Sequence, residues 1–442
     1  MRARFTPPTL SLRAEGEAIQ MRPRGSGSRR SARDDAKSLW LKAVGPVLFL
    51  ALAFASGARA EVTTLEETRV EKIDGGWERV AVDVQGRLRS FDPHNAEFDK
   101  LSDDYDEGLS YRLQATLLRP PRTGGVLFVD AGDNRALVDV ARRRGMSVLL
   151  LPTADAKAAP TSLQRLMLRD IAAYFRKTGR AKIVLGRGDI GGFAGARRNE
   201  DESGARAFDA LLLQGVSELE PFDARMPLTI EVVGSEDYWR EKPPNEKDSL
   251  RRRRFFVAGA GANAARPPFC AAPVNERSIT PALRALFVAL ADWAETGVTP
   301  PPSRTAEKSL VRADSLVWPA LPVFAGAPKD ARRVPAIDVD GNETSGLRLP
   351  DQALPLATYA PWNARRDAPG RSCGFGADLP FAPDKVEREK TGDPRLSLTE
   401  RYGSRTYYVA TVRVVADKLV KERLLLQEDA DAYVAAAKRA PF

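Results

Sequence analysis

The chain first shows the two-residue alternation of apolar and polar positions that is typical of half-buried strands. From residue 69 to about residue 119 this alternation includes VAVDV (80–84) and YRLQATLL (111–118). Such segments predict antiparallel strands, because one face of each strand meets the core and the other meets solvent. We therefore expect an antiparallel β part before the proline pair at residues 120–121.

After that proline pair the pattern changes to short, wholly apolar runs. The runs are VLFVD (126–130), SVLLLP (147–152), KIVLG (182–186), ALLLQG (210–215), LTIEVVG (228–234) and RFFVAG (254–259). Segments with helical spacing lie near residues 136–144 and 162–178. Buried parallel strands joined by crossover helices produce this pattern. The sequence thus predicts an α/β fold with one doubly wound, mostly parallel sheet.

The last third of the chain begins with an amphipathic helix, predicted at residues 280–296, whose apolar positions face the core. Residues 298–395 are rich in Pro and Gly and have few periodic runs. Disorder is the alternative, but aromatic residues such as Trp318, Tyr359 and Trp362 favour an ordered arm that wraps the sheet. Residues 397–437 return to helical spacing, with residues 424–427 between two helices.

These patterns divide the chain into five parts. They are a signal segment (1–60), an N-terminal β-rich part (61–122), an α/β core (123–302), an extended arm (303–395) and C-terminal helices (396–442). We expect residues 61–442 to fold as one composite domain, because the arm and the helices have too few apolar runs for cores of their own.

The signal segment has the three parts of a secretory signal peptide. An apolar run of 14 residues (43–56) follows several Lys and Arg residues and ends near Ala58-Arg59-Ala60. A membrane anchor is the alternative, but it needs about 20 apolar residues. We expect cleavage before Glu61 and a periplasmic or secreted protein with no stable membrane anchor. Whether Met1 or Met21 is the start stays open.

The charge balance argues against nucleic acid as a partner. The chain has 68 basic and 59 acidic side chains, of which residues 1–60 hold 11 and 4, which leaves 57 and 55. A nearly neutral mature chain has no basic stripe to displace the counterions of DNA or RNA.

The rarest residue types limit the chemistry further. His94 is the single histidine, so a His-rich metal site is excluded and general-base chemistry by histidine has one candidate. Cys270 and Cys373 are the two cysteines, and in an oxidising compartment they could form a disulfide that clamps the arm onto the core. Free buried thiols are the alternative.

Ligands of α/β sheets bind beyond the carboxyl ends of the strands. The run KIVLG leads into GRGDIGGF (186–193), a glycine-rich turn where a nucleophile elbow would lie. A dinucleotide loop is a weaker reading, because no acidic ribose partner follows a next strand. Ser235, Glu236 and Asp237 follow LTIEVVG and suit the acidic member of a triad. AGANA (260–264) follows RFFVAG, where a hydrolase would carry its histidine, and no histidine is there.

Two other polar clusters have simpler explanations. The four arginines at 251–254 precede a buried strand and favour a solvated loop end over a docking site for an anionic partner. The segment IDVDGNET (337–344) is similar to a calcium loop but lacks the EF-hand spacing, so it favours an ordinary Asp-Gly turn.

Several motifs resemble those of a bacterial family of secreted α/β-hydrolase-domain proteins. They are GGWERV (75–80), FDPHNAEF (91–98), DAGDNRA (130–136), GLRLPDQALPLATYAPWNAR (346–365) and CGFGADLPFAPDKVEREKTGDPRLSLTERYGS (373–404). The resemblance covers nearly all of the chain after the signal segment and is most specific in the two C-terminal motifs. It implies an α/β-hydrolase fold.

The resemblance also implies that the catalytic triad is degenerate. The family's elbow is similar to G-F-S-Q-S-G-R-F, which places its serine on Gly188, and its histidine, after A-G-T, falls on Ala262. The acidic member falls near Asp237 or on Glu236. Two of three triad positions thus lack their functional groups.

Serine hydrolysis needs a hydroxyl, a base and a carboxylate that orients the base. What could survive is oxyanion binding by the backbone N–H of Asp189 and by the loop that contains Asn134 and Arg135. Attack by Asp189 itself would still need a general base, for which His94 is the one candidate.

We therefore expect an exported pseudohydrolase that binds a small ligand or a protein partner, without a cofactor or a metal. An active hydrolase of carboxylic esters or amides with an unconventional site is the alternative. A structural module of the periplasm would differ from the first hypothesis only in lacking a ligand.

Overall fold

The computed structural model describes residues 10–11 and most of the chain from residue 61 onward. The described ranges are 10–11, 61–89, 95, 109–132, 134–151, 161–188, 199–201, 203–215, 224–240, 249–261, 267–368 and 370–442. The predicted signal segment, apart from residues 10–11, lies outside them, as do His94, Asp189 and Ala262.

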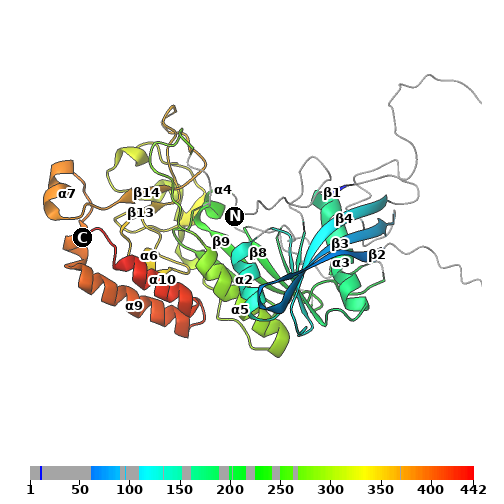
Figure 1. Cartoon of the computed structure of the whole chain (residues 1–442). Helices are drawn as coiled ribbons and strands as arrows, with labels where there is room; N and C mark the ends of the chain where they lie inside the picture. The colour runs from blue at the N-terminus through cyan, green and yellow to red at the C-terminus, as the bar shows by residue number, and fades with distance from the viewer. Residues whose placement is uncertain are drawn as a thin grey trace, which may run out of the picture.

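One mixed sheet of ten strands forms the centre of the molecule (Figure 1). Its strands are β1 Leu10–Ser11, β2 Glu61–Ile73, β3 Trp77–Leu88, β4 Leu109–Arg119, β5 Val126–Asp130, β6 Ser147–Leu150, β7 Ile183–Arg187, β8 Ala210–Gln214, β9 Leu228–Gly234 and β10 Arg252–Val257. Their order is β10-β9-β8-β7-β5-β6-β4-β3-β2, and β1 pairs with β4.

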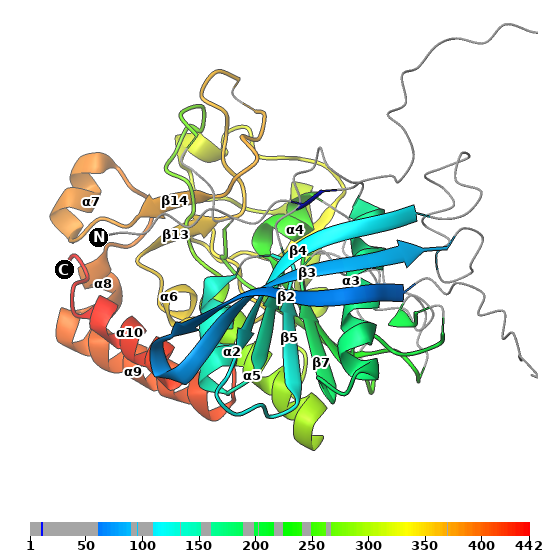
Figure 2. The same ribbon diagram turned by 45° about the vertical axis from the view of Figure 1, so that its right-hand side comes forward.

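The sheet has a parallel part and an antiparallel part, as the two hydrophobic patterns predict. β6, β5, β7, β8, β9 and β10 run parallel to one another. β4, β3 and β2 are antiparallel and cross in front of the parallel strands in Figure 2. The six apolar runs are therefore the parallel strands, which are buried on both faces.

The edge strand β2 begins earlier than the alternation predicted. It starts at Glu61 rather than near Arg69, and its pairing with β3 shifts register between Val62 and Thr64 and again between Glu67 and Arg69. Each irregularity breaks the two-residue period, which hides the strand from a search for alternation.

Helices cover both faces of the sheet. α2 (Arg135–Arg143) and α5 (Thr280–Thr296) pack on one face, where Phe287 of α5 lies against Phe128 of β5 with ring centroids 4.6 Å apart. α3 (Thr161–Lys177) packs on the other face with β2, β3 and β7. These helices match the predicted segments closely, because each has a continuous apolar face.

The arm is ordered and covers the part of the sheet that α3 does not reach. It contains β11 Leu310–Arg312, β12 Arg333–Pro335, α6 Pro350–Ala353, β13 Ala357–Ala360, β14 Ala377–Pro380 and α7 Lys385–Thr391. Val233 of β9 and Phe256 of β10 pack in one apolar cluster with Trp239, Phe324 and Trp362. The arm has few apolar runs, and its aromatic residues attach it to the sheet by packing in this cluster.

Three helices end the chain: α8 Leu398–Tyr402, α9 Arg405–Lys421 and α10 Gln427–Ala437. Leu424 and Leu425, in the turn between α9 and α10, are buried in the main core beside α5. Arg284 of α5 forms an ion pair with Glu428 at 2.7 Å. Figures 1 and 2 show the arm, yellow to orange, and these helices, red, gathered at one end of the sheet.

Asn95 is the one described residue of the FDPHNAEF motif. It is fully buried, donates to the carbonyl of Arg89 at 2.9 Å and accepts from Arg169 of α3 at 2.8 Å. Asn95 thereby links the end of β3 to α3. In the part of the chain that the structure describes, no helix is both long and apolar enough to cross a bilayer.

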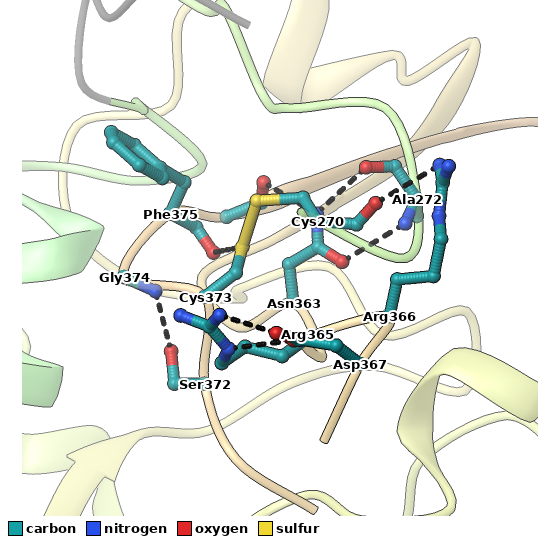
Figure 3. Close-up of a disulfide and its surroundings, with 11 residues drawn as sticks. Cys270, Ala272, Asn363, Arg365, Arg366, Asp367, Ser372, Cys373, Gly374 and Phe375 are labelled. Carbon is teal, nitrogen blue, oxygen red and sulfur yellow. Dashed lines mark hydrogen bonds and ion pairs between the residues drawn. A yellow bond between two sulfur atoms is a disulfide. The ribbon is translucent and has the colours of Figure 1, made fainter. Parts of the chain in front are cut away.

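The predicted disulfide between Cys270 and Cys373 is confirmed (Figure 3). It joins the segment after β10 to the arm across 103 residues. Asn363, from the motif YAPWNAR, supports it: its side chain binds the backbone N–H and carbonyl of Ala272 at 3.2 and 3.0 Å, and its carbonyl accepts from Cys373 at 2.9 Å. Both sulfurs belong to buried residues, so the bridge is part of the packed structure.

Replacing both cysteines by serine should lower the free energy of unfolding by about 4 kcal/mol, because a bridge over 103 residues restricts the unfolded chain. The measurement is denaturant unfolding of both proteins with and without a thiol reductant. In the reductant the wild type should approach the variant. Equal stability without the reductant would contradict a stabilising bridge.

Candidate functional site

The residue directly after β7, where the resemblance places the nucleophile, has no side chain. Gly188 follows β7 with a φ of 124°, a conformation that side chains rarely adopt. A Cβ atom added there would lie 2.9 Å from the Cβ of Ala131 and 3.0 Å from its carbonyl carbon. The position of the family's nucleophile is therefore closed to any residue other than glycine unless Ala131 moves.

A backbone hydrogen bond holds Ala131 in place beside Gly188. Its backbone N–H donates to the carbonyl of Arg187 at 2.9 Å, which continues the pairing of β5 with β7 beyond the strands. A serine at position 188 would have to break or bend this contact.

The buried carboxylate of Asp130, at the end of β5, organises the loop that follows. Asp130 has no exposed surface and accepts the N–H of Gly132 at 3.0 Å and the N–H of Asn134 at 2.8 Å. Arg187, at the end of β7, donates to the same carboxylate at 3.2 Å. One negative charge thus takes two backbone donors and a guanidinium, which is the compensation that a buried ion requires.

Arg187 lies across the carboxyl ends of three neighbouring strands. It spans from Asp130 of β5 to Gln214 of β8, whose amide oxygen accepts from Arg187 at 3.2 Å. A Cβ added to Gly132 would lie 2.4 Å from Nη1 of Arg187, so the guanidinium rests directly on the loop after β5. Its side chain is 12% exposed, so part of the guanidinium reaches solvent at this edge of the sheet.

Asn134 and Arg135 take structural positions in this loop. The N–H of Asn134 is bound to Asp130, and its side-chain oxygen accepts from the N–H of Leu137 at 3.2 Å as the N-cap of α2. Arg135 is exposed in the first turn of α2. The backbone N–H of Asn134, one of the donors expected for an oxyanion, is thus already directed to Asp130, while Asp189 lies outside the described residues.

The structure places Asp237 at the carboxyl ends of β8, β9 and β10. Asp237 lies in α4 (Ser235–Arg240), and its Oδ2 accepts the N–H of Gly234 at 2.6 Å. A Cβ added to Gly215 after β8 would lie 3.8 Å from its Oδ1, and one added to Gly234 would lie 3.6 Å from the carbonyl oxygen of Ala260. Asp237, which the resemblance offers as the acidic triad member, therefore lies at these strand ends, and the alternative Glu236 is buried.

The segment after β10 is bound tightly by its neighbours as far as Gly261. The N–H of Gly261 donates to the carbonyl of Arg277 at 2.9 Å, and an added Cβ would lie 2.0 Å from the carbonyl oxygen of Asn275. Ala262, where the resemblance places the histidine, lies outside the described residues.

Glu343 is a buried acidic residue at this edge that the sequence did not single out as a site residue. Its carboxyl is contributed by the arm, and its Oε2 accepts from Oγ of Ser235 at 2.5 Å and from the N–H of Gly259 at 2.8 Å. Burial raises the pKa of Glu343 to about 7, while these two hydrogen bonds oppose the rise. The surrounding segment, IDVDGNET, is mostly polar, so the sequence did not indicate that Glu343 is buried.

The rest of the IDVDGNET segment forms a turn, as expected. Asp338 accepts the N–H groups of Asp340 and Asn342 at 3.0 and 2.9 Å, and Asp340 forms a two-fold ion pair with Arg401 at 2.6 Å. These carboxylates stabilise the turn and its docking on α8. Within the described ranges, no group of three His, Cys, Asp or Glu side chains is arranged to hold a metal ion.

The arginine run 251–254 is only partly a loop end. Arg254 lies in β10, is buried, and pairs with Glu231 of β9, where Nε donates at 2.8 Å. Arg253 lies over the ring of Trp293 at 5.7 Å. The expectation of a wholly solvated run is therefore wrong, because β10 begins at Arg252 and draws two of these side chains into the fold.

Comparison with known proteins identifies one family. The sequence profile of a family described as "Alpha/beta hydrolase domain" matches residues 223–435, from the approach to β9 into α10. No curated protein matches the sequence.

Several solved structures share a weak likeness. TT1662 from Thermus thermophilus has 12% identity and a TM-score of 0.28, with 42% of this chain and 94% of that chain covered. A cold-adapted esterase from an Arctic intertidal metagenomic library has 11% identity and a TM-score of 0.23, with 39% and 76% covered. Lipase A of Candida antarctica has 12% identity and a TM-score of 0.23, with 36% and 43% covered. At these TM-scores the likenesses carry no argument about function.

Gly188→Ala should lower the free energy of unfolding by about 2 to 4 kcal/mol, because it adds both backbone strain and a clash with Ala131. Gly297→Ala is the matched control: its φ of 77° is also positive, but nothing lies within 4 Å of an added Cβ. The control should cost about 1 kcal/mol. Urea unfolding of both variants measures the two losses of unfolding free energy. Equal losses would show that the contact with Ala131 does not limit the side chain at position 188.

Proposed function

This chain belongs, through residues 223–435, to the alpha/beta hydrolase domain family, and from that premise we propose that it is an exported pseudohydrolase. In this proposal the chain keeps the hydrolase scaffold, has lost serine-hydrolase chemistry, and binds a small ligand or a protein partner at the carboxyl edge of its sheet.

The absence of a side chain at Gly188 is the observation that carries the proposal. Acyl transfer by the family's mechanism needs an activated hydroxyl at the apex after β7. Gly188 has none, and the contact with Ala131 leaves no room for one without a local rearrangement. A scaffold that still bore the chemistry would be expected to keep this position open.

The loop after β5 supports the same proposal through its hydrogen bonds. Oxyanion stabilisation requires N–H donors aimed at a developing negative charge in the substrate. The N–H groups of Gly132 and Asn134 instead bind the carboxylate of Asp130, which already carries a negative charge. A substrate oxyanion at this place would compete with a fixed anion.

Binding remains plausible chemistry for this edge of the sheet. Gly188 and Gly215 leave the ends of β7 and β8 without side chains, and the guanidinium of Arg187 lies between them with donors beyond the two that Asp130 and Gln214 accept. The carboxyl ends of parallel strands are where α/β sheets bind ligands. A ligand with hydrogen-bond acceptors would meet Arg187 there.

The disulfide between Cys270 and Cys373 supports export. It suits an oxidising compartment, since cytosolic thiols are kept reduced.

The alternative is an active hydrolase of carboxylic esters or amides, and one observation favours it. Ser235 has a carboxylate in hydrogen-bond reach, since its Oγ lies 2.5 Å from Oε2 of Glu343, and a carboxyl with a pKa of about 7 could serve as a base. Both residues are buried, however, so a substrate would need the arm to open first.

The purified mature protein should leave a panel of short-chain activated esters at the buffer rate of hydrolysis and should not be labelled by a fluorophosphonate probe, because Gly188, where the family's serine falls, has no hydroxyl. A variant with Gly188→Ser and Ala262→His, together with Ala131→Gly to make room, should gain labelling. The measurements are ester turnover and in-gel detection of the probe.

His94→Ala and Ser235→Ala are the control variants for this experiment. Wild-type turnover that His94→Ala abolishes would overturn the proposal and place an active site at the single histidine. Wild-type labelling that Ser235→Ala abolishes would favour the Ser235 and Glu343 pair instead.

A further inference from the structure

The Glu343 carboxyl lies where three separate parts of the chain meet. The arm contributes Glu343 itself, α4 contributes Ser235 and the segment after β10 contributes Gly259. Ser235 and Glu343 are at most 1% exposed. The side chain therefore joins the arm to the two strand ends, β9 and β10, that border the proposed binding edge.

The hydrogen bonds around Glu343 leave one of its oxygens without a partner. Oε2 accepts from Ser235 and Gly259, whereas Oε1 is buried and, among the described residues, has no hydrogen bond. Gln352 adds a second such acceptor, because its Oε1 is also buried and without a donor. This oxygen would lie 2.3 Å from a Cβ added to Gly259, so both acceptors surround the same glycine.

Two orphaned acceptors in one buried place disfavour a negative charge there. An ionised carboxylate would be left with an unsolvated oxygen, and burying an unpaired charge costs several kcal/mol. A neutral carboxylic acid keeps the two hydrogen bonds at Oε2 and avoids that cost.

The charged groups on the surrounding elements do not compensate the carboxyl. These groups are Glu236 and Asp237 on α4, Asp338 and Asp340 in the same turn, and Arg348 and Asp351 at α6. The residues after β10 that flank Gly259 are Ala258 and Ala260, which carry no charge.

Most of those groups have partners of their own. Asp340 pairs with Arg401 at 2.6 Å and Asp351 pairs with Arg277 at 3.2 Å. Arg348 donates to the carbonyl of Gln352 at 3.1 Å. Among the described residues, no Lys or Arg forms an ion pair with Glu343, so no cation is in place to receive its charge.

We propose that Glu343 is a proton-operated latch: as a neutral acid it holds its own turn of the arm against Ser235 and Gly259, and its ionisation loosens these two contacts. The disulfide and the apolar cluster keep the rest of the arm in place, so only the turn beside the carboxyl ends of β9 and β10 opens. Such opening would change access to this edge in the same way whether the edge binds a ligand or performs chemistry.

The direction of the pH effect follows from the raised pKa of Glu343. In the unfolded or released chain the carboxyl titrates near 4.5, and in the closed arm it titrates at about 7. The closed form is therefore favoured fully below about pH 4.5, and this contribution is lost as the pH rises to about 7.

Hydrogen exchange of the N–H of Gly259, which donates to Glu343, tests the latch in the full mature protein. After correction for intrinsic exchange, protection should fall at least about tenfold between about pH 6 and about pH 8.5 in the wild type. In Glu343→Gln, whose side chain is neutral, protection should not change with pH. Mass spectrometry of the peptides around Gly259 and residues 338–344 measures both.

Two further variants complete the experiment. Asp338→Asn, in the same turn, removes another carboxyl with a raised pKa and should keep the wild-type fall. Ser235→Ala removes a hydrogen bond that lowers the pKa of Glu343, so its transition should move to higher pH. If Glu343→Gln fails to fold, this shift decides the question alone.

Some results would overturn the latch. These are protection in the wild type that does not change with pH, an unchanged fall in Glu343→Gln, or a downward shift in Ser235→Ala. None of them bears on labelling by the fluorophosphonate probe, so failure of the latch and failure of the proposed function are separate outcomes.

Discussion

The buried carboxylate of Asp130 sets the arrangement of the whole carboxyl edge of the sheet. It lies at the end of the central strand β5 with no access to solvent, so its charge must be compensated by protein groups. The N–H groups of Gly132 and Asn134 and the guanidinium of Arg187 do this together. These partners cannot leave without leaving a buried charge unpaired. Ala131 therefore stays in contact with Gly188, and the N–H groups of Gly132 and Asn134 stay directed at Asp130.

A second buried carboxyl, Glu343, also loses its hydration on folding, but its charge is compensated less well than that of Asp130. Asp130 has a guanidinium beside it, whereas Glu343, among the described residues, accepts from one hydroxyl and one N–H and forms no ion pair. Desolvation therefore dominates at Glu343 and raises its pKa to about 7. One edge of the sheet thus holds a carboxylate that is paired with a guanidinium and a carboxyl whose pKa burial raises.

Several contacts fasten the arm to the segment after β10, including a disulfide, a hydrogen bond and an ion pair. The disulfide holds Cys270, the N–H of Gly259 binds Glu343, and Arg277 pairs with Asp351 while its guanidinium lies 4.7 Å from the ring centre of Tyr359. In α/β-hydrolases this segment would carry the catalytic histidine. The described residues Gly259 and Cys270, on either side of that position, are held by the arm, and the resemblance places an alanine, Ala262, at the histidine position.

The sequence by itself determined the elements of the sheet and the order of the functional loops. Parallel strands buried on both faces leave continuous apolar runs, so β5 and β9 were predicted with their bounds. The residues after the runs of β7 and β9 pointed to Gly188 and Asp237. β2 was predicted too short because its two register shifts interrupt the alternation that reports a strand.

Only the tertiary structure decided how the polar side chains are used. Glu343 and Gly259 are 84 residues apart, and Arg187 and Asp130 are 57 apart, so no local pattern links them. The letters around Glu343 are those of a solvated turn, and they become buried only because the arm folds back over β10. Periodicity reports which face of an element is apolar, whereas the pairing of distant charges depends on where the chain reverses.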